Sequence, residues 1–488
     1  MTMMTTTQDL TGRILTLDVG PMAHGGHCIA RHEGRVIFVR HAIPGEVVRA
    51  KLTDAGPQAK FWRADVVEVV DGSDYRRRHI WKLADSLRAH EMERLPVGGA
   101  EFGHITDQHQ RRLKAQVFRD TLQRIGGISA QDAAMCQDPA DGEIHVSDIG
   151  TPHSNGLHWR TRVTFGVDEH GSLAMKPHRS HDLIELRGMP LAVEAIHEST
   201  LFSADFSGAR RVEAVAPGGA EPVALVVHAD AERAADGALA ERMRRLAAAD
   251  SRIGSIVLAL ARTEAPPRRR GRGARRGRAP APSTVVEHET VVGSPTVEEP
   301  LPTPVAGPEG VRSTVAVRPE GFWQIHRHAP QALVRTVADL AQVEPGDAVA
   351  DLYAGAGLFT AWAAEAVGPQ GSVLSVEGAR SSSSSAAELF AGSQTVTVRR
   401  AAVEAALDAL SGSDVVLLDP PRAGAGRDVV AGLDDAGPRR VVYVACEPAS
   451  FARDAKDLLA RGWRMRRLQV LDLYPNTHHM ESVAVFER

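Results

Sequence analysis

Three residues near the end of the sequence have types and spacing that suit chemistry on a pyrimidine base. Cys446 follows a short apolar run, Asp419 begins the string DPPR, and Glu481 precedes the last apolar run. A cysteine thiolate can add to carbon 6 of uracil and so make carbon 5 nucleophilic. A base can then remove the proton from carbon 5, which lets the thiolate leave. A cysteine at a strand end is more often only packed there, but beside Asp419 and Glu481 it favours methylation of uracil at carbon 5.

A glycine-rich turn and a further acid indicate a nucleoside cofactor. Residues 351–357 read DLYAGAG, and the glycines let the backbone approach a ligand closely. A dinucleotide fingerprint would need one more glycine where Thr360 stands. Glu377 ends the next apolar run, where an acid can accept hydrogen bonds from a ribose. The combination favours a mononucleoside cofactor such as S-adenosylmethionine.

The string DPPR at 419–422 narrows the reaction. Its two prolines fix the backbone just after an apolar run and present Asp419 rigidly. In nucleic-acid methyltransferases this position holds the target base, and enzymes that methylate amino groups usually have an aromatic residue after the prolines. Because Arg422 stands there, methylation of an amino group is disfavoured.

Four apolar runs must position these residues. Runs at 348–350, 372–376, 414–418 and 441–445 are typical of buried parallel strands, and helical stretches separate them. Ligands of open parallel sheets bind outside the carboxyl ends of the strands. We therefore expect a Rossmann-like α/β domain over 321–488, with one crevice formed by the residues that follow the four runs, which are Asp351, Glu377, Asp419 and Cys446.

The N-terminal segment, residues 8–71, predicts a small β-barrel of the OB type. Short runs of alternating apolar and polar residues at 15–19, 35–39, 46–50 and 64–70 are broken by glycine-containing turns. Such barrels often bind oligonucleotides on one face.

Residues 72–320 predict a central α+β domain that includes a hairpin over 159–175. We expect a disordered arginine-rich insertion at 265–310, with seven arginines between Arg268 and Arg278. These charges would add salt-dependent affinity for RNA, or the insertion would be inert.

The composition of the chain limits which fold classes and functions these motifs can belong to. The 488 residues, 43% of them hydrophobic and 24% charged, indicate a folded protein of roughly three domains. A net charge of −4 does not by itself indicate a nucleic-acid binder. No apolar run is long enough for a membrane span and the N-terminus has no secretory pattern, so we expect a cytoplasmic protein. The three cysteines do not suit a disulfide framework or a metal site.

Together these motifs resemble the RNA 5-methyluridine methyltransferase family. The barrel resembles the TRAM domain, chiefly through the string IPGE at 43–46. The strings that carry the resemblance in the C-terminal domain are GFWQIH at 321–326, DLYAGAGLFT at 351–360, DPPR at 419–422, YVACEP at 443–448 and HMESV at 479–483.

The resemblance implies an S-adenosylmethionine-dependent enzyme that methylates structured RNA. The family pattern assigns cofactor binding to Gln324, Tyr353, Glu377 and Asp419, the nucleophile to Cys446 and the base to Glu481. The TRAM-containing architecture favours ribosomal RNA over tRNA, and we expect a monomer. Many relatives bind an iron–sulfur cluster, but the corresponding stretch 95–105 has no cysteine, so no cluster is expected.

Two alternatives remain open. The chain could be an RNA-binding or ribosome-assembly factor with a degenerate methyltransferase domain, because Leu358 and Ala402 depart from the family pattern. It could also be an RNA cytosine-5 methyltransferase that uses the same thiolate chemistry. The string DPPR and Glu481 match the uridine enzymes better. The sequence does not explain the serine run 381–385.

Overall fold

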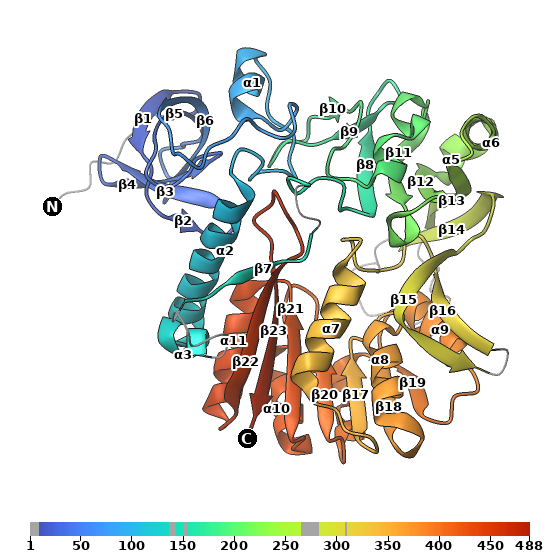
Figure 1. Cartoon of the computed structure of the whole chain (residues 1–488). Coiled ribbons are helices and arrows are strands. Elements are labelled where there is room, and N and C mark those ends of the chain that lie inside the picture. Colours follow the sequence, from blue (N-terminus) through green and yellow to red (C-terminus); the bar gives the residue numbers. More distant parts are fainter. Residues whose placement is uncertain (1–8, 136–142, 151–153, 265–282, 308–309) are drawn as a thin grey trace, which may run out of the picture. The chain divides into compact units, whose positions relative to one another are not determined.

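The computed structural model describes residues 9–135, 143–150, 154–264, 283–307 and 310–488 (Figure 1). The chain divides into two compact units, one formed by Met1–Trp159, Pro300–Ala316 and Phe322–Arg488, the other by Arg160–Glu299 and Val317–Gly321. The division into three domains stays a prediction.

The N-terminal strands form one sheet with the order β1-β5-β6-β4-β3-β2. Every second residue of these strands is buried, as in β4, where Ile37 and Val39 face the core and Phe38 lies between them. The expected strands are present, and the structure adds β2 and β3, which the alternation pattern left unassigned. The bounds are β1 (Ile14–Asp18), β2 (Met22–Ala23), β3 (His27–His32), β4 (Arg35–Arg40), β5 (Val47–Asp54) and β6 (Trp62–Asp71).

A long helix joins this sheet to the C-terminal part of the same unit. In α2 (Asp107–Thr121), Leu113 and Val117 belong to the barrel core, while Phe118 packs in the core of the C-terminal sheet. One amphipathic helix therefore contributes to two cores. The neighbouring helices are α1 (Ser86–Glu91), the π-helix η1 (Leu122–Gly126) and α3 (Ala130–Met135).

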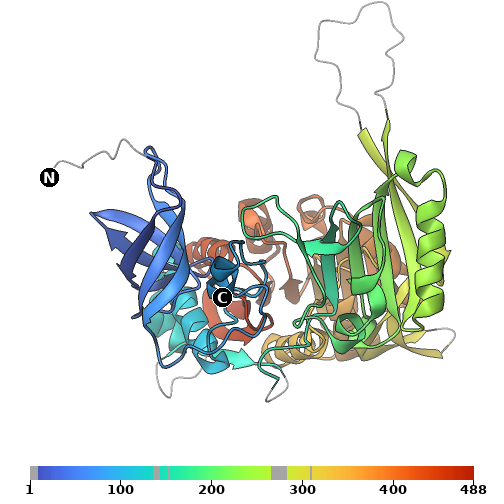
Figure 2. The same ribbon diagram turned by 90° about the horizontal axis from the view of Figure 1, so that it is seen from above.

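The second unit is built on a sheet with the order β10-β9-β8-β11-β12-β13-β14. The predicted hairpin is confirmed, because Gly166 of β8 pairs antiparallel with Ala174 of β9. Helix α6 packs against this sheet (Figure 2). The bounds are β8 (Arg162–Val167), β9 (Leu173–Met175), β10 (Ile184–Glu185), β11 (Ala209–Val215), β12 (Val223–Asp230), β13 (Ile253–Glu264), β14 (Ser283–Val292), α4 (Glu194–His197), α5 (Ala231–Ala234) and α6 (Ala238–Ala249).

The prediction of disorder over residues 265–310 is wrong for the second half of that range. There the chain forms β14 and then β15 (Val297–Gly307), which pairs with β16 (Gly310–Val317). Burial alternates along β15 from Val297 onward, a two-residue period that favours a strand. The arginine run, residues 268–278, lies outside the described residues.

The C-terminal sheet has the order β19-β18-β17-β20-β21-β23-β22-β7. Its first five strands are parallel, and β23 is antiparallel to both β21 and β22. The predicted Rossmann-like sheet is thus confirmed. The bounds are β7 (Val146–Asp148), β17 (Ala348–Leu352), β18 (Ser372–Glu377), β19 (Val396–Arg400), β20 (Val415–Leu418), β21 (Arg440–Ala445), β22 (Arg464–Asp472) and β23 (Glu481–Glu487).

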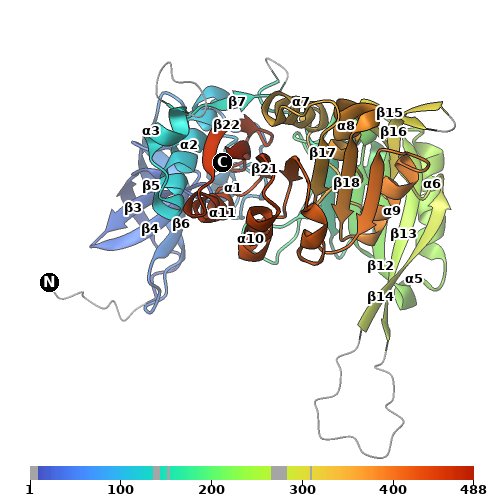
Figure 3. The same cartoon turned by 90° about the horizontal axis from the view of Figure 1, so that it is seen from below.

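Helices cover both faces of this sheet, with α7 and α8 on one side and α10 and α11 on the other (Figure 3). The serine run begins a regular helix, α9, in which Ser382, Ser383 and Ser385 are buried. In the described residues no helix is both long and apolar enough to cross a membrane. The bounds are α7 (Ala329–Ala341), α8 (Leu358–Val367), α9 (Arg380–Leu389), α10 (Gly426–Ala436) and α11 (Pro448–Ala460).

Candidate active site

The carboxyl ends of four neighbouring parallel strands bring the predicted residues to one edge of the sheet. Asp351 is the next-to-last residue of β17 and Glu377 the last residue of β18, while Asp419 and Cys446 follow β20 and β21 directly. Electrostatic coupling joins Asp351 to both Glu377 and Asp419, and joins Cys446 to Asp419. The expected convergence is therefore observed.

The glycine turn is held by Glu377. Gly355 donates its backbone N–H to Glu377 Oε2 at 2.9 Å, and the N–H of Ala379 reaches Oε1 at 2.5 Å. Gly355 has φ of +57°, in the left-handed region that favours glycine, and a Cβ placed there would meet no described atom within 4 Å. The space beside the turn is open to a ligand.

Tyr353 precedes this turn in a strained backbone conformation. Its φ of +61° is rare for a residue with a side chain. Its ring is half-buried against the core, and burial, reinforced by Glu404 and Asp454, raises the pKa of its phenol to about 12. Gln324 is buried in the segment between β16 and α7.

Asp351 is a structural acid beneath the crevice. It is buried, and Thr360 Oγ1 donates a hydrogen bond to its Oδ2 at 2.6 Å. Burial raises the pKa of Asp351 to about 7, against the opposing effect of the Thr360 hydrogen bond. Thr360, which takes the place of a fingerprint glycine, thus supports this acid.

Two further acids belong to the same group. Burial, together with the negative charge of Asp351, raises the pKa of Asp419 to about 7. Glu481 is buried, and burial and then Asp419 raise its pKa well above the usual range. The hydroxyl of Tyr474 donates to Glu481 Oε2 at 3.2 Å and acts in the opposite direction. Burial and Asp419 therefore disfavour ionisation of Glu481 in the free enzyme.

Strand pairing places the cysteine beside this acid. Ala445 of β21 is the register partner of Ser482 of β23, so the next residues outward, Cys446 and Glu481, are neighbours. Burial, then the charges of Glu481 and Asp419, raises the pKa of the Cys446 thiol to about 12. The positive charge of Arg422 acts in the opposite direction and lowers the pKa of the thiol. With its pKa raised overall, Cys446 is therefore a thiol at neutral pH.

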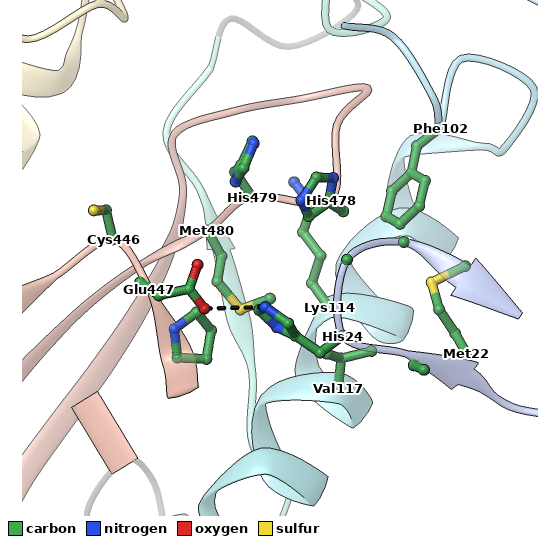
Figure 4. Close-up of a pocket in the computed structure, with 14 residues that line it drawn as sticks. Met22, His24, Phe102, Lys114, Val117, Cys446, Glu447, His478, His479 and Met480 are labelled. Carbon is green, nitrogen blue, oxygen red and sulfur yellow. Dashed lines mark ion pairs between the residues drawn. The ribbon is translucent and has the colours of Figure 1, made fainter. Parts of the chain in front are cut away.

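The barrel reaches the same edge through its β2–β3 turn. Figure 4 shows the pocket that this turn shares with Cys446 and the residues after it. His24 Nε2 and Glu447 Oε1 lie 3.1 Å apart, and this ion pair raises the pKa of His24, while it lowers that of Glu447 against the effect of burial. Glu447 also caps α11. Sequence reasoning missed His24, because nothing in the local pattern relates it to a residue more than 400 positions away.

The loop that carries Tyr474 is anchored by Asn476. This residue is fully buried, and its Oδ1 accepts hydrogen bonds from Arg77 at 2.7 Å and Gln110 at 2.9 Å. Its Nδ2 donates to the carbonyl oxygen of Gly156 at 2.8 Å. Sequence reasoning missed both Tyr474 and Asn476. The string YPN before Glu481 was the available signal, since a proline there marks a constrained turn.

Within the described ranges, no group of three or more His, Cys, Asp or Glu side chains is arranged to hold a metal ion. Cys136 lies outside those ranges.

Two family models match the chain, the tRNA (uracil-5-)-methyltransferase model over residues 318–488 and the TRAM domain over residues 8–67. An uncharacterized RNA methyltransferase of Streptomyces coelicolor is 34% identical over 482 residues, which are 98% of this chain and 93% of that protein. A 23S rRNA (uracil(1939)-C(5))-methyltransferase of Alkalilimnicola ehrlichii is 30% identical over 480 residues, with coverage of 96% and 95%.

Among solved structures, a tRNA (uracil-54, C5)-methyltransferase of Pyrococcus abyssi in complex with S-adenosyl-L-homocysteine is similar in fold. The TM-score is 0.62 at 18% identity, and the alignment covers 96% of this chain and all of the other. The N-terminal barrel, the Rossmann-like sheet and the relatives matched over nearly their whole length agree. The chain therefore belongs to the TRAM-containing family of S-adenosylmethionine-dependent RNA (uracil-5-)methyltransferases.

Proposed function

We propose that this protein methylates carbon 5 of a uridine in ribosomal RNA through a covalent adduct at Cys446, and that it acts as a monomer in the cytoplasm. The observation that carries the proposal is the β21–β23 register, which sets Cys446 beside Glu481 at the edge where Asp419 also lies. A nucleophile and a base next to each other are what carbon-5 methylation of uracil needs.

The residues at the strand ends fit the cofactor. Glu377 is fixed at the glycine turn, the space beside Gly355 is open, and Asp419 carries a carboxylate that a cation would stabilise. Gln324 and Tyr353 would complete the cofactor site. When bound, S-adenosylmethionine supplies an electrophilic methyl group.

The side chains then act in order. The Cys446 thiol loses its proton to water, Sγ bonds to carbon 6, and the electrons of the carbon 5–carbon 6 double bond move onto the oxygen at carbon 4. Carbon 5 then takes up the methyl group as the carbonyl at carbon 4 re-forms, which leaves neutral S-adenosylhomocysteine. Glu481, as carboxylate, removes the remaining proton from carbon 5, the double bond re-forms, and the carbon 6–Sγ bond breaks to release thiolate.

Raised pKa values set a condition on this sequence. Because burial and nearby acids disfavour ionisation of both Cys446 and Glu481 in the free enzyme, binding of RNA and cofactor must shift both toward their ionised forms. The positive charge of the cofactor would act in that direction, and Arg422 already lowers the pKa of Cys446 in the free enzyme.

The preference for ribosomal RNA is supported by full-length relatives. The proteins of Alkalilimnicola ehrlichii and Shewanella halifaxensis are both named 23S rRNA (uracil(1939)-C(5))-methyltransferases, at 30% and 25% identity. The barrel turn beside Cys446 supports RNA entering from the barrel side.

The test is methyl transfer from labelled S-adenosylmethionine to unmodified 23S rRNA and, separately, to unmodified tRNA, followed by nucleoside analysis. We expect labelled 5-methyluridine in the ribosomal RNA. Labelled methylcytidine would instead support the cytosine-5 alternative, and 5-methyluridine in tRNA alone would refute the ribosomal preference. A folded protein that fails to bind S-adenosylmethionine in a calorimetric titration would support the RNA-binding factor.

A further inference from the structure

Tyr474 is buried against the carboxylate of Glu481. It lies in the loop between β22 and β23, and its hydroxyl donates a hydrogen bond to Glu481 Oε2 at 3.2 Å. Its ring makes edge-to-face contacts with Trp159, at 6.2 Å between centroids, and with His479, at 5.9 Å. These two contacts fix the direction of the phenol oxygen.

The two oxygens of Glu481 differ in their surroundings. Oε2 receives the Tyr474 hydroxyl, whereas Oε1 is buried and has no hydrogen-bond partner among the residues that the structure describes. A buried carboxyl oxygen without a partner is costly unless a ligand supplies one. The hydrogen bond from Tyr474 thus holds one oxygen and leaves Oε1 to meet the substrate.

The groups that face Glu481 come from three neighbouring elements. They are Asp419 after β20, Cys446 after β21, and Tyr474 in the loop before β23. Asp419 opposes ionisation of Glu481, while the Tyr474 hydrogen bond favours it. Tyr474 itself stays protonated, because burial and the neighbouring acids raise its pKa well above the usual range. It is therefore a donor at any working pH.

We propose that Tyr474 is a positioning residue, one that orients Glu481 for removal of the carbon-5 proton and sets the pH above which Glu481 acts as base. This inference rests on the proposed function, in which Glu481 resolves the Cys446 adduct.

The variant Tyr474→Phe tests it, because it keeps the ring and removes only the hydroxyl. In single-turnover experiments with labelled RNA, the denaturation-stable protein–RNA adduct should persist about tenfold longer than in wild type, since a hydrogen bond to a charged group is lost. The acidic limb of the pH profile for adduct resolution should move to higher pH, because the carboxylate of Glu481 has lost the Tyr474 hydroxyl as hydrogen-bond donor.

The matched control is Tyr443→Phe. The Tyr443 hydroxyl is also buried and donates to Asp454 Oδ2 at 2.7 Å, on the side of the sheet that packs against α11. Its loss should lower thermal stability and leave the pH dependence of adduct resolution unchanged. A shift of that pH dependence in both variants would show a general packing effect and overturn the inference.

A second probe guards against misfolding of the first variant. Site-specific 2,3-difluorotyrosine at position 474 keeps the shape of the side chain and makes the phenol a stronger donor, so the acidic limb should move to lower pH. A purely structural role of Tyr474 would not shift the pH profile in opposite directions in Tyr474→Phe and in the difluorotyrosine variant.

The two hypotheses fail in different ways. If Cys446→Ala still transfers methyl groups, the covalent mechanism itself is wrong. If Cys446→Ala is inactive and Glu481→Gln accumulates adduct, but Tyr474→Phe resolves the adduct with the wild-type rate and pH profile, then the mechanism stands and the role of Tyr474 is refuted.

Discussion

At the scale of single residues, the crevice is a group of acids around a thiol, and burial raises the pKa values of several of them. Asp351 and Asp419 have pKa values raised to about 7, and burial raises the pKa of Cys446 to about 12. A cation that enters such a site favours the ionised forms of the acids and the thiol. Cofactor binding and ionisation should therefore be coupled.

Binding of S-adenosylmethionine should strengthen as pH rises from 6 to 8. Asp419 titrates with a raised pKa of about 7, and its carboxylate form attracts the sulfonium, so affinity should rise by up to about tenfold per pH unit below that pKa. Isothermal titration calorimetry in buffers of different ionisation enthalpy measures this. S-adenosylhomocysteine, which has no sulfonium charge, should show a weaker dependence, and Asp419→Asn should remove it. Equal slopes for both ligands would contradict the role of Asp419.

Replacement of Cys446 by Ala should abolish both product and covalent adduct, because it removes the thiol that we propose adds to carbon 6. Cys28→Ala is the matched control: Cys28 is buried in the barrel core, so its loss should cost about 1 kcal/mol of stability and leave turnover intact. Denaturing gels with labelled RNA report the adduct. Adduct formation by Cys446→Ala would refute the assignment of the nucleophile.

At the scale of elements, hydrogen bonds connect the loop before Glu481 to N-terminal residues of the chain. Besides its side-chain hydrogen bonds, Asn476 accepts the backbone N–H of Phe102 at 3.0 Å and donates its own N–H to Gln110 Oε1 at 2.8 Å. Its φ of +63° is one that asparagine and glycine tolerate best. The loop before Glu481 therefore depends on residues distant in sequence.

Substitution Asn476→Gly should keep the left-handed backbone and remove the amide. Arg77 and Gln110 would then each lose one hydrogen-bond acceptor, which should lower the free energy of unfolding by roughly 2–4 kcal/mol and reduce turnover as Glu481 loses its support. Denaturant unfolding and single-turnover rates measure both. The control Asn155→Gly changes an exposed asparagine with φ of +51° and should have little effect. Equal losses in the two variants would refute this role for Asn476.

At the scale of the whole molecule, RNA affinity is expected to come from several separate parts. The net charge of −4 gives no general attraction to phosphate, so local cations must supply it. The run from Arg268 to Arg278 holds seven of them, between strands β13 and β14, which pair antiparallel. The strand ends that carry Asp419 and Cys446 belong to the other compact unit.

Deletion of residues 268–278 should weaken RNA binding at low salt and flatten the dependence of affinity on salt, because fewer counterions are released. Turnover at saturating RNA should hardly change, since the run holds none of the residues assigned to catalysis. Filter binding between about 50 and 200 mM salt, together with turnover rates, measures both effects. Loss of turnover at saturating RNA with intact binding would place the run at the active site.

The sequence by itself determined the order of elements and the residue types at the strand ends. Apolar runs followed by Asp351, Glu377, Asp419 and Cys446 could be recognised because strand burial and turn composition are local properties. The barrel strands followed from two-residue alternation for the same reason. The two strands after the arginine run were missed, because the proline- and arginine-rich composition before them obscured a polar alternating pattern.

Only the tertiary structure decided which residues share the site. The pairing of β21 with β23 makes Cys446 a neighbour of Glu481, and the anchored loop turns Tyr474 toward that acid. The ion pair between His24 and Glu447 likewise joins segments far apart in the chain. Register, burial and raised pKa values arise from contacts between distant segments, and no local pattern encodes them.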